Sequence, residues 1–297
     1  RRYDDWNIRR AGVLARQSGR EVIVETAFVD DPMLEGWADG TVMLAEGDES
    51  SEFDLDYYFS NVRLDEIARR FEQEEVTGQA YLSGSLSGTV DEPEVTGDLI
   101  VFRPRFRKYN ACAITANLAF SEDTLIIEQL LGSRRTIGLA VSGRMQNITN
   151  IAAKEDGPVP ICGQFEIAGA DLRDVGELIE PDFEDLAGLA EAEGAFGGTL
   201  AYPTASGRVH VVDALPGTVD ITEGFVPFEL QGDVLTVTDA RIRAKGATLT
   251  ADAALDFTNR ARPVLAASLS AADVHLEGLQ LLEDTGIDAA GIVQIPV

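Results

Sequence analysis

The sequence is poor in residue types that specialised protein chemistry needs. Its 297 residues include two cysteines, Cys112 and Cys162, and two histidines, His210 and His275. Two cysteines cannot build a disulfide framework or a cysteine-rich zinc site, although a single bridge between them stays open. Because Cys112 falls on the apolar side of an alternating segment, we expect it to be buried and not redox-active.

Long hydrophobic runs and positive charge are also scarce. No run approaches the roughly 18 apolar residues that a membrane-spanning helix requires. The 24 Lys and Arg stand against 51 Asp and Glu, which gives a formal net charge of −27. A surface this negative repels phosphate backbones, so the composition argues against nucleic-acid binding. The acidic composition fits either a salt-adapted protein or a segment of a larger protein. The sequence begins at Arg1 as if inside a longer chain, which favours a segment.

Catalytic patterns are missing as well. Each histidine lies in an aliphatic run, and no nearby serine or cysteine arrangement supplies a nucleophile. Between Gly84 and Gly88, a leucine occupies the position where a nucleophile elbow needs serine. The acidic clusters lack the spacing of a calcium-binding loop. We therefore predict a protein that is not an enzyme and that holds no metal or cofactor.

Internal repetition is the strongest pattern in the chain. A Gly-Thr-aliphatic-x-x-Pro-x-x-x-Gly motif begins at Gly88 and again at Gly198, 110 residues later. Upstream, segment 62–71 matches 170–179 two residues out of step, and a third copy starts at Val274. We predict a preceding unit over 1–52, repeats over 53–161 and 162–272, and the start of a third repeat over 273–297. We assign the motif residues to turns and sharp bends: Gly84, Gly88, Pro93, Gly97, Gly194, Gly198, Pro203 and Gly207.

Between the motifs, apolar and polar residues alternate with the period of a β-strand, as in 112–120 and 249–257. Turn residues separate these segments, which predicts about five strands per repeat, joined mostly as antiparallel meanders. The spacings from Leu64 to Ile67 and from Leu172 to Val175 are helical, so each repeat carries one short helix. The predicted fold is all-β with short helical segments: an elongated, curled antiparallel sheet with a hydrophobic concave face.

The signature Gly-x-aliphatic-x-Gly-Thr-x-x-x-Pro-x-x-x-Gly, preceded by a short leucine-rich helical turn and followed by alternating strands, resembles the AsmA-like superfamily and its TamB branch. The resemblance runs from residue 53 to the end of the chain. It implies a repeating β-groove, or β-taco, in a periplasmic protein that is anchored in the inner membrane and reaches towards the outer membrane. It also implies phospholipid transport, or assembly of outer-membrane proteins together with a barrel of the BamA/TamA type.

The apolar alternation itself allows two interpretations. A second sheet or the helices could seal it as an ordinary core, or it could form an open trough for phospholipid acyl chains. We favour the trough, because a sheet face cannot cover itself and each repeat offers one short helix as a lid. The alternatives are a scaffold that assembles barrel proteins by strand augmentation, and a structural spacer. The predicted groove-lining residues are Ile114, Leu118, Leu125, Ile127, Ile137, Leu139, Val141, Val226, Phe228, Leu235, Val237, Leu249, Leu255 and Leu269.

Overall fold

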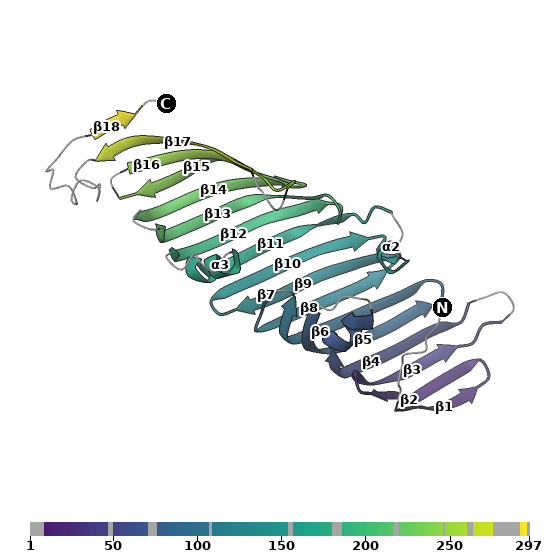
Figure 1. Ribbon diagram of the computed structural model, residues 1–297. Helices are drawn as coiled ribbons and strands as arrows, with labels where there is room; N and C mark the ends of the chain where they lie inside the picture. The colour runs from purple at the N-terminus through teal and green to yellow at the C-terminus, as the bar shows by residue number, and fades with distance from the viewer. Residues whose placement is uncertain are drawn as a thin grey trace. The chain divides into compact units, whose positions relative to one another are not determined.

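The computed structural model confirms the all-β, curled antiparallel fold: 80% of it is strand and 6% is helix (Figure 1). It describes residues 9–46, 50–70, 76–106, 109–153, 157–179, 186–216, 220–245, 247–259, 264–275 and 292–295. The chain divides into two compact units. Unit 1 contains residues 1–134 and 141–157, and unit 2 contains residues 135–140 and 158–297.

In unit 1, each strand pairs antiparallel with the strand that follows it, with one exception. The two-residue β7 pairs only with β6, and β6 then also pairs with β8. A short helix, α1, follows β4, and a second, α2, follows β10. Strand β10 runs from Ile137 to Gln146, so its first residues belong to unit 2 and its last ones to unit 1. The remaining elements are β1 (Arg10–Ser18), β2 (Glu21–Asp31), β3 (Leu34–Met43), β4 (Glu52–Arg63), α1 (Leu64–Arg70), β5 (Val76–Thr89), β6 (Pro93–Phe106), β7 (Tyr109–Asn110), β8 (Ala113–Ser121), β9 (Thr124–Arg134) and α2 (Ile148–Ala153).

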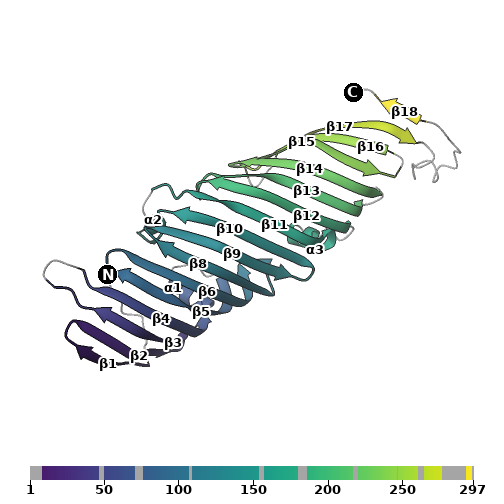
Figure 2. The same ribbon diagram turned by 180° about the vertical axis from the view of Figure 1, so that it is seen from behind.

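Unit 2 repeats this arrangement, again with antiparallel pairing between strands that follow one another in the chain (Figure 2). Its helix α3 stands after its first strand, as α1 stands after β4. The elements are β11 (Ile161–Asp171), α3 (Leu172–Ile179), β12 (Leu186–Gly198), β13 (Pro203–Pro216), β14 (Ile221–Gln231), β15 (Val234–Ala244), β16 (Ala247–Asp256), β17 (Val264–His275) and β18 (Ile292–Ile295).

The sequence repeat is also a repeat of elements. Strands β15 and β16 begin and end 110 residues after β9 and β10, and α3 begins 108 residues after α1. The predicted short helices are therefore confirmed. The estimate of about five strands per repeat was low, since the six strands β12 to β17 begin within 162–272 and β11 begins one residue before it, at Ile161. Residues 276–291 of the third copy lie outside the described part of the chain.

β-Bulges recur at matching positions of the repeats. The ladder shifts by one residue beside Asn61 in β4 and beside Gly169 in β11, where φ is 56° and 62°. It shifts again beside Arg103 in β6 and Asp213 in β13, where φ is 47° and 49°. Each bulge adds a residue to one strand and increases its local twist. The bend of the sheet is therefore built from the same irregularities in both repeats.

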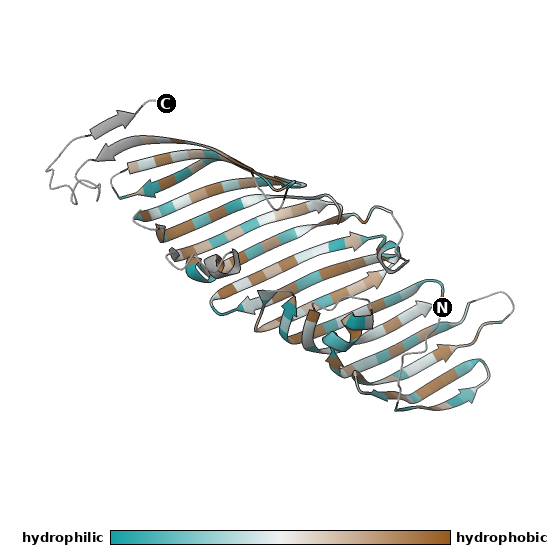
Figure 3. Cartoon of the chain, in the orientation of Figure 1, coloured by the Kyte–Doolittle hydropathy of each residue, from teal (hydrophilic) through white to brown (hydrophobic). Residues whose placement is uncertain are grey.

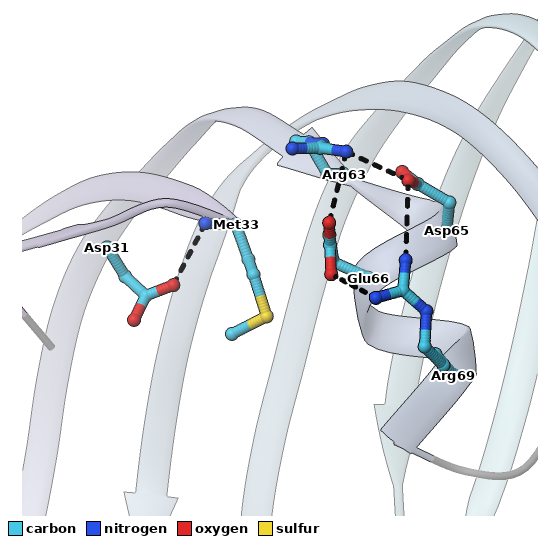
Figure 4. A network of polar contacts seen from close by, with 6 residues as sticks. All are labelled: Asp31, Met33, Arg63, Asp65, Glu66 and Arg69. Atoms are coloured by element: carbon cyan, nitrogen blue, oxygen red, sulfur yellow. Dashed lines mark hydrogen bonds and ion pairs between the residues drawn. The ribbon is translucent and has the colours of Figure 1, made fainter. Parts of the chain in front are cut away.

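Helix α1 is tied to the strand before it by ion pairs (Figure 4). Arg63, the last residue of β4, donates a hydrogen bond to the Asp65 carboxylate at 3.0 Å and pairs with Glu66 at 3.1 Å. Arg69 pairs with Glu66 at 3.0 Å from the next turn. The backbone N–H of Arg63 also donates to the carbonyl of Met33 at 2.8 Å, so the start of α1 is fixed to the β2–β3 turn.

The pKa of Asp65 makes this attachment sensitive to acid. Partial burial raises the pKa of the carboxyl, but the hydrogen bond and the charge of Arg63 outweigh burial, and the pKa falls below its ordinary value of 3.8. Stability from a lowered pKa is present above the unfolded-state value and is lost as the pH falls through the folded-state value. Below pH 3.8 we therefore expect hydrogen-exchange protection factors in α1 to decrease. Asp65→Asn should remove most of this pH dependence of the protection factors. The same pH dependence in the variant and in the unmodified chain would contradict the role of Asp65.

Candidate functional site

One side of each unit's sheet is apolar. Residues directly opposite each other on antiparallel strands point to the same side, so the pairing defines rows of side chains across the sheet. In unit 1 from β4 to β9, no residue that the described ladder places on this side is charged. One such row runs across five strands through Leu55, Leu86, Val95, Phe120 and Leu125.

Unit 2 has an apolar side of the same kind. A row through β12 to β17 contains Phe196, Ala205, Leu230, Leu235, Leu255 and Leu265. On the opposite side of the same strands, Glu193, Arg208 and Thr248 alternate with the apolar residues and point towards solvent. Figure 3 shows this alternation as brown and teal bands along the strands. We call the two uncharged sides the apolar faces.

The apolar faces are half-exposed. In the part of the chain that the structure describes, no large side chain is fully buried, and seven of the ten buried hydrophobic residues are alanines: Ala68, Ala80, Ala116, Ala170, Ala190, Ala214 and Ala240. Leu269 keeps 61% of its surface exposed. A sealed core would bury its leucines and phenylalanines at close packing. The described residues therefore do not form a second layer over these faces.

The glycine motif shows the direction of curl. Gly84 lies directly opposite Gly97, and a Cβ added to Gly84 on the apolar side would overlap the Thr96 carbonyl oxygen and come within 2.7 Å of the Gly97 Cα. In unit 2, a Cβ on Gly207 would overlap the Glu193 carbonyl oxygen in the same way. The neighbouring strand therefore leans towards the apolar side, which makes the apolar face concave at these positions.

An aromatic ring covers each pair of glycines. Tyr57 lies opposite Gly84, and its hydroxyl donates to the Thr96 carbonyl at 2.9 Å. Burial, and secondarily the charge of Asp98, raise the pKa of Tyr57. Phe165 takes the equivalent place opposite Gly194, 2.8 Å from where a Cβ would stand. Such rings fill the space that paired glycines leave in a sheet.

The turn assignment of the motif needs a correction. Gly84, Gly97, Gly194 and Gly207 lie inside strands β5, β6, β12 and β13 and make no turn, because their role is close strand approach. The other four do flank turns: Gly88 pairs with Pro93 and Gly198 with Pro203 at the strand ends. Gly88 and Gly198 have φ values of 91° and 82°, which glycine adopts without strain.

Eleven of the fourteen predicted lining residues fall on the apolar faces. The ladder places Ile114, Leu118, Leu125 and Ile127 together in unit 1. In unit 2 it places together Val226, Phe228, Leu235, Val237, Leu249, Leu255 and Leu269. Ile137, Leu139 and Val141 alternate along β10 and are half-buried. Contact of these residues with acyl chains stays a prediction.

The remaining candidates do not assemble into a reactive site. The expectation that Cys112 is buried was wrong: it is exposed and precedes β8, and no disulfide joins it to Cys162. His210 stacks on Phe225 at 4.5 Å on the polar side, beside Glu223. The His275 side chain lies outside the described residues. Within the described ranges, no cluster of three metal-binding side chains occurs, and no helix is long and apolar enough to cross a membrane.

The fold and the apolar faces together define an all-β repeat protein with a curled sheet whose concave side is uncharged and half-open. No protein-family model, curated protein or solved structure matches the chain. The resemblance to the TamB branch therefore depends on the sequence motif alone.

Proposed function

We propose that the chain is a periplasmic segment of a TamB/AsmA-like protein that conducts phospholipids along its apolar faces. The observation that supports this most directly is the uninterrupted absence of charge on a concave, half-exposed sheet face. An acyl chain that lies on such a face leaves water and gains about 0.8 kcal/mol for each buried CH₂ group. Its polar headgroup stays at the solvated rim.

Uniform lining suits conduction better than storage. The rows of aliphatic side chains offer similar contacts from strand to strand, so an acyl chain meets no deep pocket that would trap it. The apolar faces thus provide a path without a preferred stopping point.

Lipid analysis of the purified chain tests the proposal. We expect organic-solvent extraction followed by mass spectrometry to detect phospholipid in stoichiometric amounts, and a fluorescent phospholipid to bind the delipidated protein. A lipid-free extract together with no binding would contradict the proposal. Crosslinks from the sheet to an outer-membrane barrel protein, without bound lipid, would support the assembly scaffold instead.

A further inference from the structure

The β6–β7 hairpin has the opposite charge to the rest of the chain. Between Asp98 and Glu122 the sequence contains no acidic residue, although the chain has 51 of them. The same stretch contains four basic residues, Arg103, Arg105, Arg107 and Lys108. The structure describes Arg103 and Arg105, and both are exposed. An acid-free, basic segment in a chain of net charge −27 indicates a surface for a negatively charged partner.

Aromatic side chains accompany these cations. In the hairpin Phe106 pairs with Tyr109, and the two keep 49% and 46% of their surface exposed. Arg105 pairs with Asn110 on the other side of the hairpin. Arg134 of β9 donates a hydrogen bond to Asn110 at 3.1 Å and adds a third cation at the base. The hairpin is therefore amphipathic, with exposed rings on one side and guanidinium groups on the other.

The second repeat shows that the scaffold does not require these residues. Asp213 occupies the bulge position of Arg103 with nearly the same φ, 49° against 47°. Aspartate tolerates a positive φ better than arginine does, so backbone geometry does not explain Arg103. Leu215 and Pro216 stand where repeat 1 has Arg105 and Phe106, and the described part of repeat 2 has no counterpart of β7. The basic and aromatic character is specific to the first repeat.

We propose that the β6–β7 hairpin docks onto the headgroup layer of a membrane containing anionic phospholipids. Guanidinium groups bind lipid phosphates, and each basic residue near an anionic membrane contributes about 1 kcal/mol. Exposed Phe and Tyr rings insert at the boundary between headgroups and acyl chains. A protein partner would need a shaped pocket for Phe106 and Tyr109, whereas the headgroup layer accepts rings without shape complementarity. This docking is independent of whether the apolar faces conduct lipid.

The overall negative charge makes the docking depend on salt in a characteristic way. At low ionic strength the Debye length reaches about 30 Å, so the net charge of the whole chain repels an anionic membrane. At physiological ionic strength it falls to about 8 Å, and only the charges of the hairpin act on the nearby headgroups. We therefore expect vesicle binding to rise from low to physiological salt and to fall at higher salt.

Vesicle co-sedimentation tests the docking. The probes are phosphatidylcholine vesicles with and without a minor fraction of phosphatidylglycerol. The double variant Arg103→Asn/Arg105→Leu keeps a residue that tolerates positive φ and should bind the anionic vesicles about 25-fold more weakly, at about fivefold per cation removed. The control Arg208→Ser/Arg243→Ser makes the same charge change on the polar side of unit 2 and should bind like the unmodified chain. Phe106→Ala should weaken binding to both vesicle types.

Three results would overturn the docking. The first is no binding of the unmodified chain to anionic vesicles, and the second is equal loss in the double variant and its control. The third is a hairpin variant that changes self-association in analytical ultracentrifugation but not vesicle binding, which would assign the hairpin to a second copy of the chain. Binding of fluorescent phospholipid to the apolar faces should be the same in the double variant and in its control. Failure of the docking is therefore distinguishable from failure of lipid conduction.

Discussion

Leu249→Asp is expected to abolish phospholipid binding in unit 2 while the chain stays folded. Leu249 lies in β16 between Ile242 and Ala271 on the apolar face, and its side chain is half-buried. An acyl chain crossing this row would have to bury the new carboxylate without a partner, which costs far more than the contacts gain. In the free protein the carboxylate reaches water, so the expected loss of unfolding free energy is about 1 kcal/mol. Fluorescent-phospholipid titration and urea unfolding measure the two effects.

The neighbouring residue supplies the matched control. Thr248 in the same strand is exposed on the polar side, opposite Arg243. Thr248→Asp introduces the same charge there and should change neither lipid binding nor stability. If Leu249→Asp unfolds the protein, the position belongs to a sealed core. If it stays folded and binds phospholipid normally, the apolar face is not the lipid path.

Gly194→Ala is expected to destabilise unit 2 strongly, although it adds a single methyl group. A Cβ at this position would overlap the Ser206 carbonyl oxygen and the ring of Phe165 at 2.8 Å. The ring has other rotamers, but a backbone carbonyl moves only if the strand β13 moves with it. Forcing a methyl group into such a contact costs about 3 kcal/mol, which urea unfolding of the variant should detect.

Gly224→Ala separates this effect from a general intolerance of glycine replacement. Gly224 lies in β14 on the same face of unit 2, and the nearest side-chain atoms to an added Cβ, on Ile242 and Val211, are 3.8 Å away. Alanine should be neutral there or stabilise the strand by about 0.5 kcal/mol, because it has less backbone entropy to lose. Equal destabilisation by both substitutions would contradict the role of Gly194 in close strand approach.

The alternating pattern predicted the apolar faces because it is a local signal. A strand turns successive side chains to opposite sides, so residues such as Leu118 and Leu255 could be assigned to one face before any pairing was known. The helix positions were predictable for the same reason. The ladder then brings these residues into common rows, which is the step that periodicity in one strand cannot supply.

Features that depend on two strands escaped prediction. The role of Gly84 is visible only when Gly97 and the Tyr57 ring are placed beside it, and these lie on different strands. Cys112 was misassigned because the alternation of apolar and polar residues begins one residue before β8 does. The pattern therefore included Cys112 in the strand, although it lies just outside it. The basic character of the hairpin could have been predicted by aligning the two repeats with each other, because Arg103 and Arg105 align with Asp213 and Leu215 of the second repeat.

The succession of the strands has a consequence for how this protein forms. Within each unit, ladder partners follow one another in the chain, so no distant segment has to be found before the sheet can start. The cost of closing long loops, which slows other β-proteins, is small here. Folding can therefore proceed hairpin by hairpin from a first nucleus. Gain or loss of a whole repeat would lengthen or shorten the sheet without leaving a strand unpaired, so repeat number is free to vary during evolution.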